Sequence, residues 1–275
     1  PTFLREIVDN VHRFVPHDIQ REVANKFHAG CAVGILNSPD TACNPETDPY
    51  LIQRYDVADH RNAKRQNKLY LQERLGLDMN PDAPMLFWPS RLDPIQKGCQ
   101  LLAEILYRIV DKYWNQSLQV VFVANGAYQQ VFHDIVHHHN LYNRIAVCNF
   151  DERLSHIGFA ASDFMLMPSL FEPCGLPQMT SAIYGSLPIA RDTGGLHDSV
   201  FHINLEQNTG NGFLFETYDS GGLEWAIDQA MAFYQKDVHT RSAQIGRVMA
   251  ESKVRFSHTV TAQAYIDIYE QMLQR

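Results

Sequence analysis

The sequence predicts an α/β fold built on a doubly wound, Rossmann-like parallel sheet. Short apolar runs alternate along the middle of the chain with segments whose apolar residues recur at helical spacing, which is the pattern of successive βαβ units. The short runs are continuously apolar rather than alternating, as expected of strands covered on both faces. Ligands of such sheets lie beyond the carboxyl ends of the strands, so a site is expected at the strand-to-helix turns.

Strands are expected where a short apolar run ends in turn residues. They cover residues 83–91, 117–126, 144–150, 163–169, 186–192 and 211–216. Helices are expected where apolar residues recur every three or four positions, as Leu101, Leu102 and Ile105 do. They cover residues 98–114, 128–140, 153–162, 175–185 and 221–235. Strand and helix therefore alternate, and the crossovers between parallel strands should be right-handed.

The two flanks differ from this central part. Residues 1–30 are expected to be helical and amphipathic, and the Pro-, Asp- and Asn-rich residues 37–60 are expected to form an ordered linker. Residues 62–75 have the composition of a polar helix. The last residues, 261–275, are expected to form a terminal amphipathic helix.

Composition limits the kinds of protein that this chain can be. Of its 275 residues, 45% are hydrophobic and 20% are charged, which is enough apolar material for a globular core. The formal net charge of -8 argues against non-specific binding to nucleic acid or to an anionic membrane. The five cysteines are scattered without a C-x-x-C pair, which predicts a reducing, cytoplasmic environment and no zinc site. No apolar run approaches the roughly 18 residues of a membrane span.

The first turn that can carry chemistry is SRLDPIQKG, residues 90–98. Arg91 leaves the expected strand, and Lys97 precedes Gly98 at the start of the next helix. Two cations and a helix amino terminus together favour an anion. The alternative is a pair of solvated surface cations, which are common on proteins.

The second turn is SLFEPCGLPQ, residues 169–178. Glu172 lies in the turn, and Gly175 and Leu176 begin a helix whose backbone N–H groups could face a phosphate. A carboxylate at this position can accept hydrogen bonds from the hydroxyl groups of a sugar. The alternatives are that Glu172 is a helix-start carboxylate stabilised by the helix dipole and that Cys174 is a small buried hydrophobe.

Two further turns contribute a glycine pair and an aromatic ring. Thr193, Gly194 and Gly195 follow an expected strand, and paired glycines let the backbone approach a ligand closely. Phe150 ends another strand at the same edge, where its ring could stack on a base, a contact worth roughly 1–3 kcal/mol. The alternatives are an ordinary tight turn and a core phenylalanine.

Together the four turns describe a pocket for a nucleotide sugar. They bring cations for phosphate, an aromatic ring for a base, and a carboxylate with glycines for a hydroxyl-bearing group to one edge of one sheet. No metal is expected. The histidines in this part of the chain include an i, i+4 pair, but without an H-E-x-x-H motif they are typical of a solvated helix face. They are His133, His137, His138 and His139.

At these residues the chain resembles the glycogen and starch synthases, retaining glucosyltransferases that use a sugar nucleotide. The resemblance covers residues 31 to 275 and lies in an ordered set of motifs, which are SRL with QKG, PSLFEPCGL, YGSLPI and TGGLHDSV. It implies the carboxyl-terminal, donor-binding half of a glycosyltransferase B-type fold, which has two facing Rossmann-like domains. The implied reaction adds α-1,4-linked glucose from ADP-glucose to the non-reducing end of an α-glucan, with retention and without a cofactor.

The resemblance implies a role for each residue of the four turns. Arg91 and Lys97 would bind the diphosphate and stabilise the charge that grows on it as the glucosyl bond breaks, so no metal is needed. Glu172 would contact the glucose, and Phe150 would stack on the base. The remaining donor-binding positions are Cys174, Gly175, Leu176, Thr193, Gly194 and Gly195.

The resemblance also implies a domain organisation. Residues 1–36 would be a remnant of the amino-terminal domain and interdomain segment, residues 37–255 the sugar-nucleotide-binding domain, and residues 256–275 a helix that crosses back to the missing domain. The expected partners are ADP-glucose or ADP, an α-glucan acceptor and that missing domain. The chain is expected to be a fragment, inactive or weakly active alone, because closure of two domains assembles the site.

Two departures from the family pattern keep a second class of function open. The loop between Arg91 and Lys97 is one residue longer than usual, and Pro177 stands where a Thr is common, which removes a hydroxyl and an amide near the phosphates. The alternative is a non-catalytic module that senses the sugar nucleotide or docks on a partner synthase. A sucrose or trehalose-phosphate synthase is a weaker third interpretation.

Overall fold

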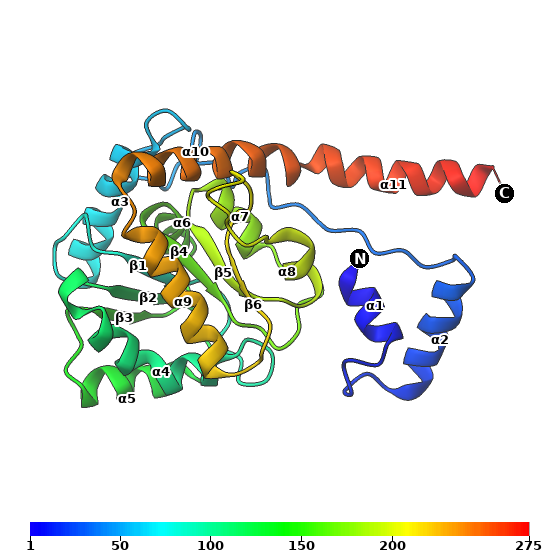
Figure 1. Cartoon of the computed structure of the whole chain (residues 1–275), viewed down its shortest axis with the longest axis horizontal. Coiled ribbons are helices and arrows are strands. Elements are labelled where there is room, and N and C mark those ends of the chain that lie inside the picture. The colour runs from blue at the N-terminus through cyan, green and yellow to red at the C-terminus, as the bar shows by residue number, and fades with distance from the viewer. Residues whose placement is uncertain (275) are drawn as a thin grey trace.

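The parallel sheet predicted from the sequence is confirmed. A computed structural model describes residues 1–274, and within them six parallel strands pair in the order β3-β2-β1-β4-β5-β6 (Figure 1). Each strand lies inside a predicted run and is shorter than it, because pairing ends where the turn residues begin. The strands are β1 (Met85–Trp88), β2 (Gln119–Val123), β3 (Ile145–Cys148), β4 (Phe164–Met167), β5 (Leu187–Arg191) and β6 (Phe213–Phe215).

Helices connect the strands and flank the sheet. Those after the strands are α4 (Cys99–Lys112), α5 (Gln129–His138), α6 (Glu152–Ala161), α7 (Pro177–Ile183), α8 (Gly194–Ser199) and α9 (Ser220–Tyr234). Before the sheet come α1 (Thr2–Val8), α2 (His17–His28) and α3 (His60–Leu75), and after it come α10 (Val238–Arg255) and α11 (His258–Leu273). The sequence predicted neither α8 nor α10. Helix α8 replaces an expected glycine-rich turn, and α10 is mostly polar and buries only a few positions, such as Val248 and Met249, near α7.

Successive strand residues enter two separate clusters of buried side chains. Leu86 and Trp88 belong to a cluster that includes residues of α4 and α9. Met85 and Phe87 belong to another, which includes residues of α3 and α6. The strands are therefore covered on both faces, which explains their continuously apolar sequences and confirms the doubly wound arrangement.

Three helices lie outside the sheet and its covering layers. Helices α1, α2 and α11 contain no buried residue, and Figure 1 shows α11 running out past α8 while α1 and α2 form a separate pair below it. The helical stretch predicted for residues 1–30 is interrupted at residues 9–16, and Pro16 immediately precedes α2. None of the helices in residues 1–274 combines the length and apolar character that crossing a membrane requires.

The segment predicted as an ordered linker is held to the sheet domain by a buried carboxylate. Asp48 is fully buried, and its Oδ2 lies 2.6 Å from His156 Nδ1 and 2.5 Å from the hydroxyl of Tyr184. Its Oδ1 accepts a hydrogen bond from the backbone of Tyr50 at 2.9 Å. Burial alone would raise the pKa of Asp48, but the hydrogen bonds from His156 and Tyr184 hold this pKa below its ordinary value.

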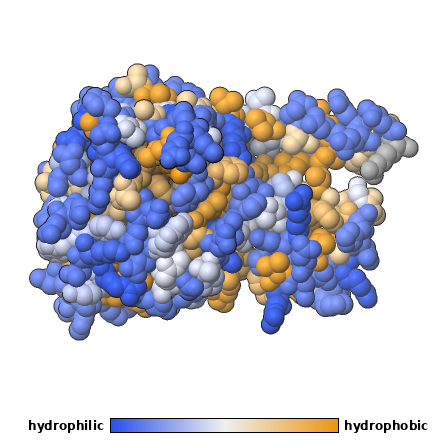
Figure 2. Space-filling view, in the orientation of Figure 1, coloured by the Kyte–Doolittle hydropathy of each residue, from blue (hydrophilic) through white to orange (hydrophobic). Residues whose placement is uncertain are grey.

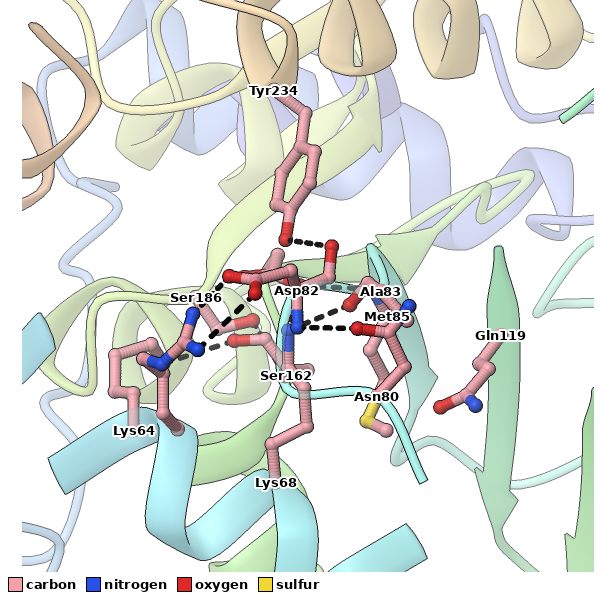
Figure 3. Close-up of polar contacts among 12 residues, drawn as sticks. Lys64, Lys68, Asn80, Asp82, Ala83, Met85, Gln119, Ser162, Ser186 and Tyr234 are labelled. Atoms are coloured by element: carbon pink, nitrogen blue, oxygen red, sulfur yellow. Dashed lines mark hydrogen bonds and ion pairs between the residues drawn. The ribbon is translucent and has the colours of Figure 1, made fainter. Parts of the chain in front are cut away.

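A buried lysine attaches α3 to the amino-terminal edge of the sheet (Figure 3). Lys64 Nζ donates to the carbonyl oxygens of Ala160 and Ser162 at 2.9 Å each and of Tyr184 at 3.1 Å. These carbonyls lie at the carboxyl ends of α6 and α7. The ammonium group therefore satisfies carbonyls that these helices leave unpaired, in the place where a helix dipole favours a cation.

Candidate functional site

The four turns selected in the sequence all lie at the carboxyl-terminal edge of the sheet. Residues 90–98 follow β1, residues 168–176 follow β4, residues 192–195 follow β5, and residues 149–151 follow β3. Strands β1, β4 and β5 are neighbours, whereas β3 is separated from β1 by β2. Three of the turns are therefore adjacent, and the turn with the aromatic ring lies farther along the same edge.

The turns after β1 and β4 meet in an ion pair. Lys97 Nζ lies 2.5 Å from Glu172 Oε2, and the two side chains are 12% and 8% exposed. Ser169, which is fully buried, places its hydroxyl 3.4 Å from the same carboxylate oxygen. The longer loop that precedes Lys97 therefore does not remove it from Glu172. Together they form a pair of opposite charges, nearly shielded from water, at the end of the central strands.

The loop that carries Arg91 is shaped by Asp93. Oδ1 of Asp93 accepts hydrogen bonds from the backbone of Ile95 at 2.9 Å and of Gln96 at 2.7 Å. These hydrogen bonds lower the pKa of Asp93 below its ordinary value, and the bond from Gln96 has the largest effect. The charges of Arg91 and Lys97 lower this pKa further. Arg91 itself is exposed, and within residues 1–274 its guanidinium group makes a single hydrogen bond, to Gln96 Oε1 at 3.4 Å.

A glycine allows the first two turns to approach each other. Gly98 has φ +71°, and a Cβ atom there would lie 2.0 Å from the carbonyl oxygen of Pro168. Any other residue would be strained in this conformation and would collide with the turn after β4. The backbone of Leu170 also donates to the carbonyl of Gln96 at 2.8 Å. Gly98 was noted in the sequence only as a helix start, and its contact with Pro168 shows a second reason for it.

The turn that contains Cys174, Gly175 and Leu176 is organised by Gln178, which the sequence analysis did not select. Gln178 is 1% exposed, and its Nε2 donates to the carbonyls of Cys174 at 3.0 Å and Gly175 at 2.8 Å. Burial raises the pKa of the Cys174 thiol, so this group is protonated at neutral pH. Leu176 is exposed and precedes α7, whose first residue is Pro177. Proline is well tolerated there because that N–H is unpaired within the helix in any case.

The turn after β5 is closed by a residue from the other end of the chain. The backbone N–H of Gly194 and the hydroxyl of Thr193 both donate to Glu6 Oε1, at 2.8 Å and 3.0 Å. The N–H of Gly195 donates to the carbonyl of Glu172 at 2.7 Å. The donors that the sequence suggested for a ligand are thus engaged within the protein. Sequence reasoning missed Glu6 because it lies in a helix assigned to a different domain.

Phe150 and Arg191 complete this edge. Phe150 is 58% exposed, so the alternative of a core phenylalanine is wrong. Arg191, at the end of β5, was not selected from the sequence. Its Nη1 lies 2.5 Å from the carbonyl of Leu170, its guanidinium group lies 5.1 Å from the ring centre of Tyr218, and burial lowers its pKa. The turn after β4 is therefore contacted by cations from both neighbouring turns.

Two of the histidines in and just after α5 contact aromatic side chains. His137 Nδ1 lies 2.5 Å from the hydroxyl of Tyr142, and the ring of His139 stacks on Tyr107 with 3.9 Å between centroids. Across residues 1–274, no three side chains of His, Cys, Asp or Glu are grouped as a metal ion would require.

Comparison with known proteins gives a family model and close relatives. The family model described as glycosyl transferases group 1 matches residues 73–245. The glycogen synthases of Acholeplasma laidlawii and Bacillus subtilis are 35% and 34% identical over 99% of this chain, which covers 55% and 54% of their lengths. The solved catalytic domain of starch synthase IV from Arabidopsis thaliana, bound to ADP and acarbose, is 33% identical with a TM-score of 0.85, over 100% of this chain and 55% of that one.

These findings confirm two predictions made from the sequence. The resemblance to glycogen and starch synthases is confirmed, and so is the Rossmann-like half of a two-domain glycosyltransferase fold. A sucrose-phosphate synthase from Thermosynechococcus elongatus has a TM-score of 0.58 at 21% identity, which indicates a shared fold only. The chain spans about half the length of the curated relatives it matches.

Proposed function

The chain belongs to the family of glycosyl transferases group 1, and from that premise we propose that it supplies the donor site of a glucan synthase. In this proposal it binds ADP-glucose and takes part in transferring glucose, with retention, to the non-reducing end of an α-1,4-glucan. The likeness to glycogen synthases along nearly the whole chain supports the reaction. The ADP bound to starch synthase IV supports the nucleotide.

The observation that carries the proposal is the ion pair between Lys97 and Glu172. Each group neutralises the other at 2.5 Å in a place that water scarcely reaches. A sugar nucleotide offers a new partner to both, because its phosphates can bind Lys97 and the hydroxyl groups of its sugar can bind Glu172. Arg91 would add a second cation. Arg91 and Lys97 would then stabilise the charge that develops on the leaving nucleoside diphosphate without a metal ion.

The remaining residues of the edge fit a donor that extends along it. Phe150 follows β3 and presents an exposed ring, which could stack on the base. In this arrangement the diphosphate lies near the loop after β1, and the sugar lies near Glu172 and the turn after β5. Cys174, Gly175 and Leu176 would border the sugar and the adjoining phosphate. Thr193, Gly194 and Gly195 would act by supporting this border, since their donors are already bonded within the protein.

A second half of the enzyme is part of the proposal. The relatives are about twice as long as this chain, so an α-glucan acceptor would lie between this half and an amino-terminal domain. Figure 2 shows apolar residues gathered where α11 and the α1–α2 pair face each other. Several exposed apolar side chains lie in α11 and in residues 1–36, among them Val11, Phe14, Val33, Val260 and Tyr265. We assign residues 1–36 to a remnant of the amino-terminal domain and the interdomain segment, residues 37–255 to the donor domain and residues 256–275 to the returning helix.

One observation favours a non-catalytic sugar-nucleotide-binding module as a second candidate. Glu6 already occupies the donors of Thr193 and Gly194, so these donors are engaged by the chain itself rather than offered to a glucosyl group. A module that only binds the nucleotide would not need them. The enzyme and the module share the donor pocket and differ in whether glucose is transferred.

Calorimetric titration of the 275-residue chain with ADP-glucose, ADP and UDP-glucose tests the shared pocket. We expect ADP-glucose and ADP to bind, and Arg91→Ala to weaken both by about tenfold, because a charge-assisted contact to phosphate is lost. Arg108→Ala is the matched control, since Arg108 pairs with Glu224 on the exposed side of α4 and α9. If none of the three nucleotides binds the unmodified chain, the proposed donor site is wrong.

A second measurement separates the enzyme from the module. The chain is joined to the amino-terminal half of a relative such as the Acholeplasma laidlawii glycogen synthase, and incorporation of labelled glucose into glycogen is followed. We expect transfer by the joined protein and little or none by the chain alone, because closure of the two halves assembles the site. Nucleotide binding by a joined protein that transfers no glucose would favour the module.

A further inference from the structure

Helix α1 docks on α8 at the same edge of the sheet as the candidate donor site. The hydroxyl of Thr2 donates to Asp198 Oδ1 at 2.7 Å, and the backbone of Thr2 donates to Oδ2 at 2.9 Å. The ring of Phe3 stacks on Phe171, one residue before Glu172, with 6.5 Å between centroids. The amino-terminal segment therefore touches both the turn after β5 and the turn after β4.

Glu6 is the polar centre of this contact. One carboxylate oxygen accepts from Gly194 N and Thr193 Oγ1, and the other lies 2.8 Å from His12 Nε2. The side chains of Glu6 and His12 are 14% and 6% exposed. Phe14 and Phe171 pack beside His12, so the carboxylate is held from several sides. Hydrogen bonds to a charged acceptor in such a sheltered place are among the stronger ones.

The turn that Glu6 holds supports the backbone of Glu172. Gly194 has φ +47°, and a Cβ atom there would lie 2.1 Å from the carbonyl oxygen of Glu172. The N–H of the next residue, Gly195, donates to this same oxygen at 2.7 Å. The carboxylate of Glu172 in turn meets Lys97. A continuous set of contacts thus runs from Glu6 through the turn after β5 to the side chain proposed to bind the sugar.

We propose that Glu6 is a positioning residue for the sugar-binding part of the donor pocket. It fixes the turn at residues 193–195, and this turn sets the place from which Glu172 reaches a sugar hydroxyl. The inference rests on the proposed function, because it assigns Glu6 a role within that same pocket. It also means that a shift of the amino-terminal segment is transmitted to the sugar-binding carboxylate.

The geometry predicts that the role of Glu6 is specific for the sugar. Phe150, proposed for the base, follows β3 and is separated from β5 by β2, β1 and β4 in the sheet. Arg91 lies on the loop after β1, which Asp93 orders through its own hydrogen bonds. Neither depends on the turn that Glu6 holds. Lys97 contacts Glu172 but is carried by the loop that Asp93 orders, so removal of Glu6 should weaken binding of the glucosyl group much more than binding of the nucleotide.

The test compares ADP-glucose with ADP in calorimetric titrations of the 275-residue chain and its variants. Glu6→Ala should weaken ADP-glucose binding by about tenfold, the effect of losing the organisation that one charge-assisted bond provides, and ADP binding by less than about twofold. Glu6→Gln keeps an acceptor oxygen for Gly194 and Thr193 and should restore most of the affinity for ADP-glucose. Glu22→Ala is the matched control, because Glu22 is exposed on α2 and, in the part of the chain that the structure describes, forms an ion pair with Lys26 alone.

Each result decides the matter. Equal weakening of ADP-glucose and ADP, or no weakening of either, would overturn the positioning role while the donor site stands. If the unmodified chain binds neither ligand, the proposed function itself fails and the role of Glu6 with it. Should Glu6→Ala not fold, as judged by circular dichroism, Glu6→Asp replaces it. This variant keeps the charge but withdraws the carboxylate from Gly194 by one methylene, and the same sugar-specific loss is expected.

Discussion

Each edge of the sheet holds a lysine that is largely shielded from water, but the two lysines have different partners. At the amino-terminal edge, the Lys64 ammonium group donates its three N–H groups to three backbone carbonyls, of which that of Ser162 is drawn in Figure 3, and within residues 1–274 it forms no ion pair with a carboxylate. At the carboxyl-terminal edge, Lys97 meets one carboxylate, that of Glu172. Burial lowers the pKa of Lys64 to about 7. The first lysine therefore completes the backbone of the fold, whereas the second keeps hydrogen-bonding capacity for another partner.

The difference shows how a structural cation can be told from one that is available to a ligand. A lysine whose N–H groups all donate to buried carbonyls can bind phosphate only if those hydrogen bonds break. The buried carbonyls would then be unpaired, and the loss of folding free energy would exceed the binding free energy of the phosphate contact. A lysine paired with a single carboxylate can exchange it for phosphate while the carboxylate finds another donor. On this criterion Lys97 is available to a ligand and Lys64 is not, whereas Lys68, at the amino-terminal edge, divides its donors between Asp163 and the carbonyl of Ala83.

The largest expected effect is the loss of stability in Lys64→Met. The carbonyls of Ala160 and Ser162 lose this donor and that of Tyr184 keeps the hydroxyl of Tyr55, so the free energy of unfolding should fall by roughly 3 kcal/mol. Urea denaturation of the variant and of Lys112→Met, an exposed lysine on α4, measures it. Binding of ADP to the folded variant should not change. A loss of ADP affinity as large as that of a phosphate-binding residue would contradict the division between the edges.

The complementary variant, Lys97→Met, should act on binding more than on folding. Loss of a cation from the phosphate site should weaken ADP binding by about 2 kcal/mol, roughly 30-fold, while leaving Glu172 without its partner. Calorimetric titration with ADP gives the affinity, and thermal unfolding shows whether the fold is kept. Lys236→Met, at an exposed lysine after α9, is the control. Unchanged ADP affinity in the Lys97 variant would place the phosphates elsewhere.

The smallest expected effect concerns the pair between Asp48 and His156, which joins the linker to α6. The hydrogen bond from His156 to Asp48 raises the pKa of His156 above its ordinary value of 6.5. The stabilisation is therefore complete below pH 6.5 and is lost as the pH rises through the raised value; it is also lost in acid, as the pH falls through the lowered pKa of Asp48. His156→Gln should cost about 1 kcal/mol at pH 5.5 and less at pH 8.5.

Thermal unfolding across this pH range measures the difference between His156→Gln and the unmodified chain. His133→Gln, at an exposed histidine of α5, should show no such dependence. A cost for His156→Gln that stays constant from pH 5.5 to 8.5 would show that the ring contributes by packing rather than by charge.

The convergence of the site could be predicted from the sequence because it depends on topology. Parallel strands bring their carboxyl ends to one edge, so Lys97 and Glu172 had to lie near each other although 75 residues separate them. The strands could be predicted as well, because each is marked by a short apolar run in its own part of the sequence.

Other features could not be predicted because their partners lie far away in the sequence and carry no pattern. Residues 62–75 were expected to form a polar helix, yet Lys64, Lys68 and Gln72 of α3 are buried, since backbone carbonyls from distant turns satisfy them. Glu6 meets a turn 187 residues later. Helix α10 has too few apolar residues for the sequence to predict that one of its faces is buried. Polar burial of this kind is decided by tertiary structure and not by periodicity.

The extended segment at residues 31–36 leaves the sheet domain beside α11, and the hydroxyl of Thr261 donates to the carbonyl of Leu36 at 3.1 Å (Figure 1). Two adjoining segments, residues 31–36 and α11, therefore leave the sheet domain side by side. A second half attached through both segments could rotate like a hinge about the line that joins the two connections, whereas rotation about other axes would be restricted. Any fusion designed to rebuild a larger protein should therefore connect the two halves through both segments. A single connection would not fix the relative orientation of the halves.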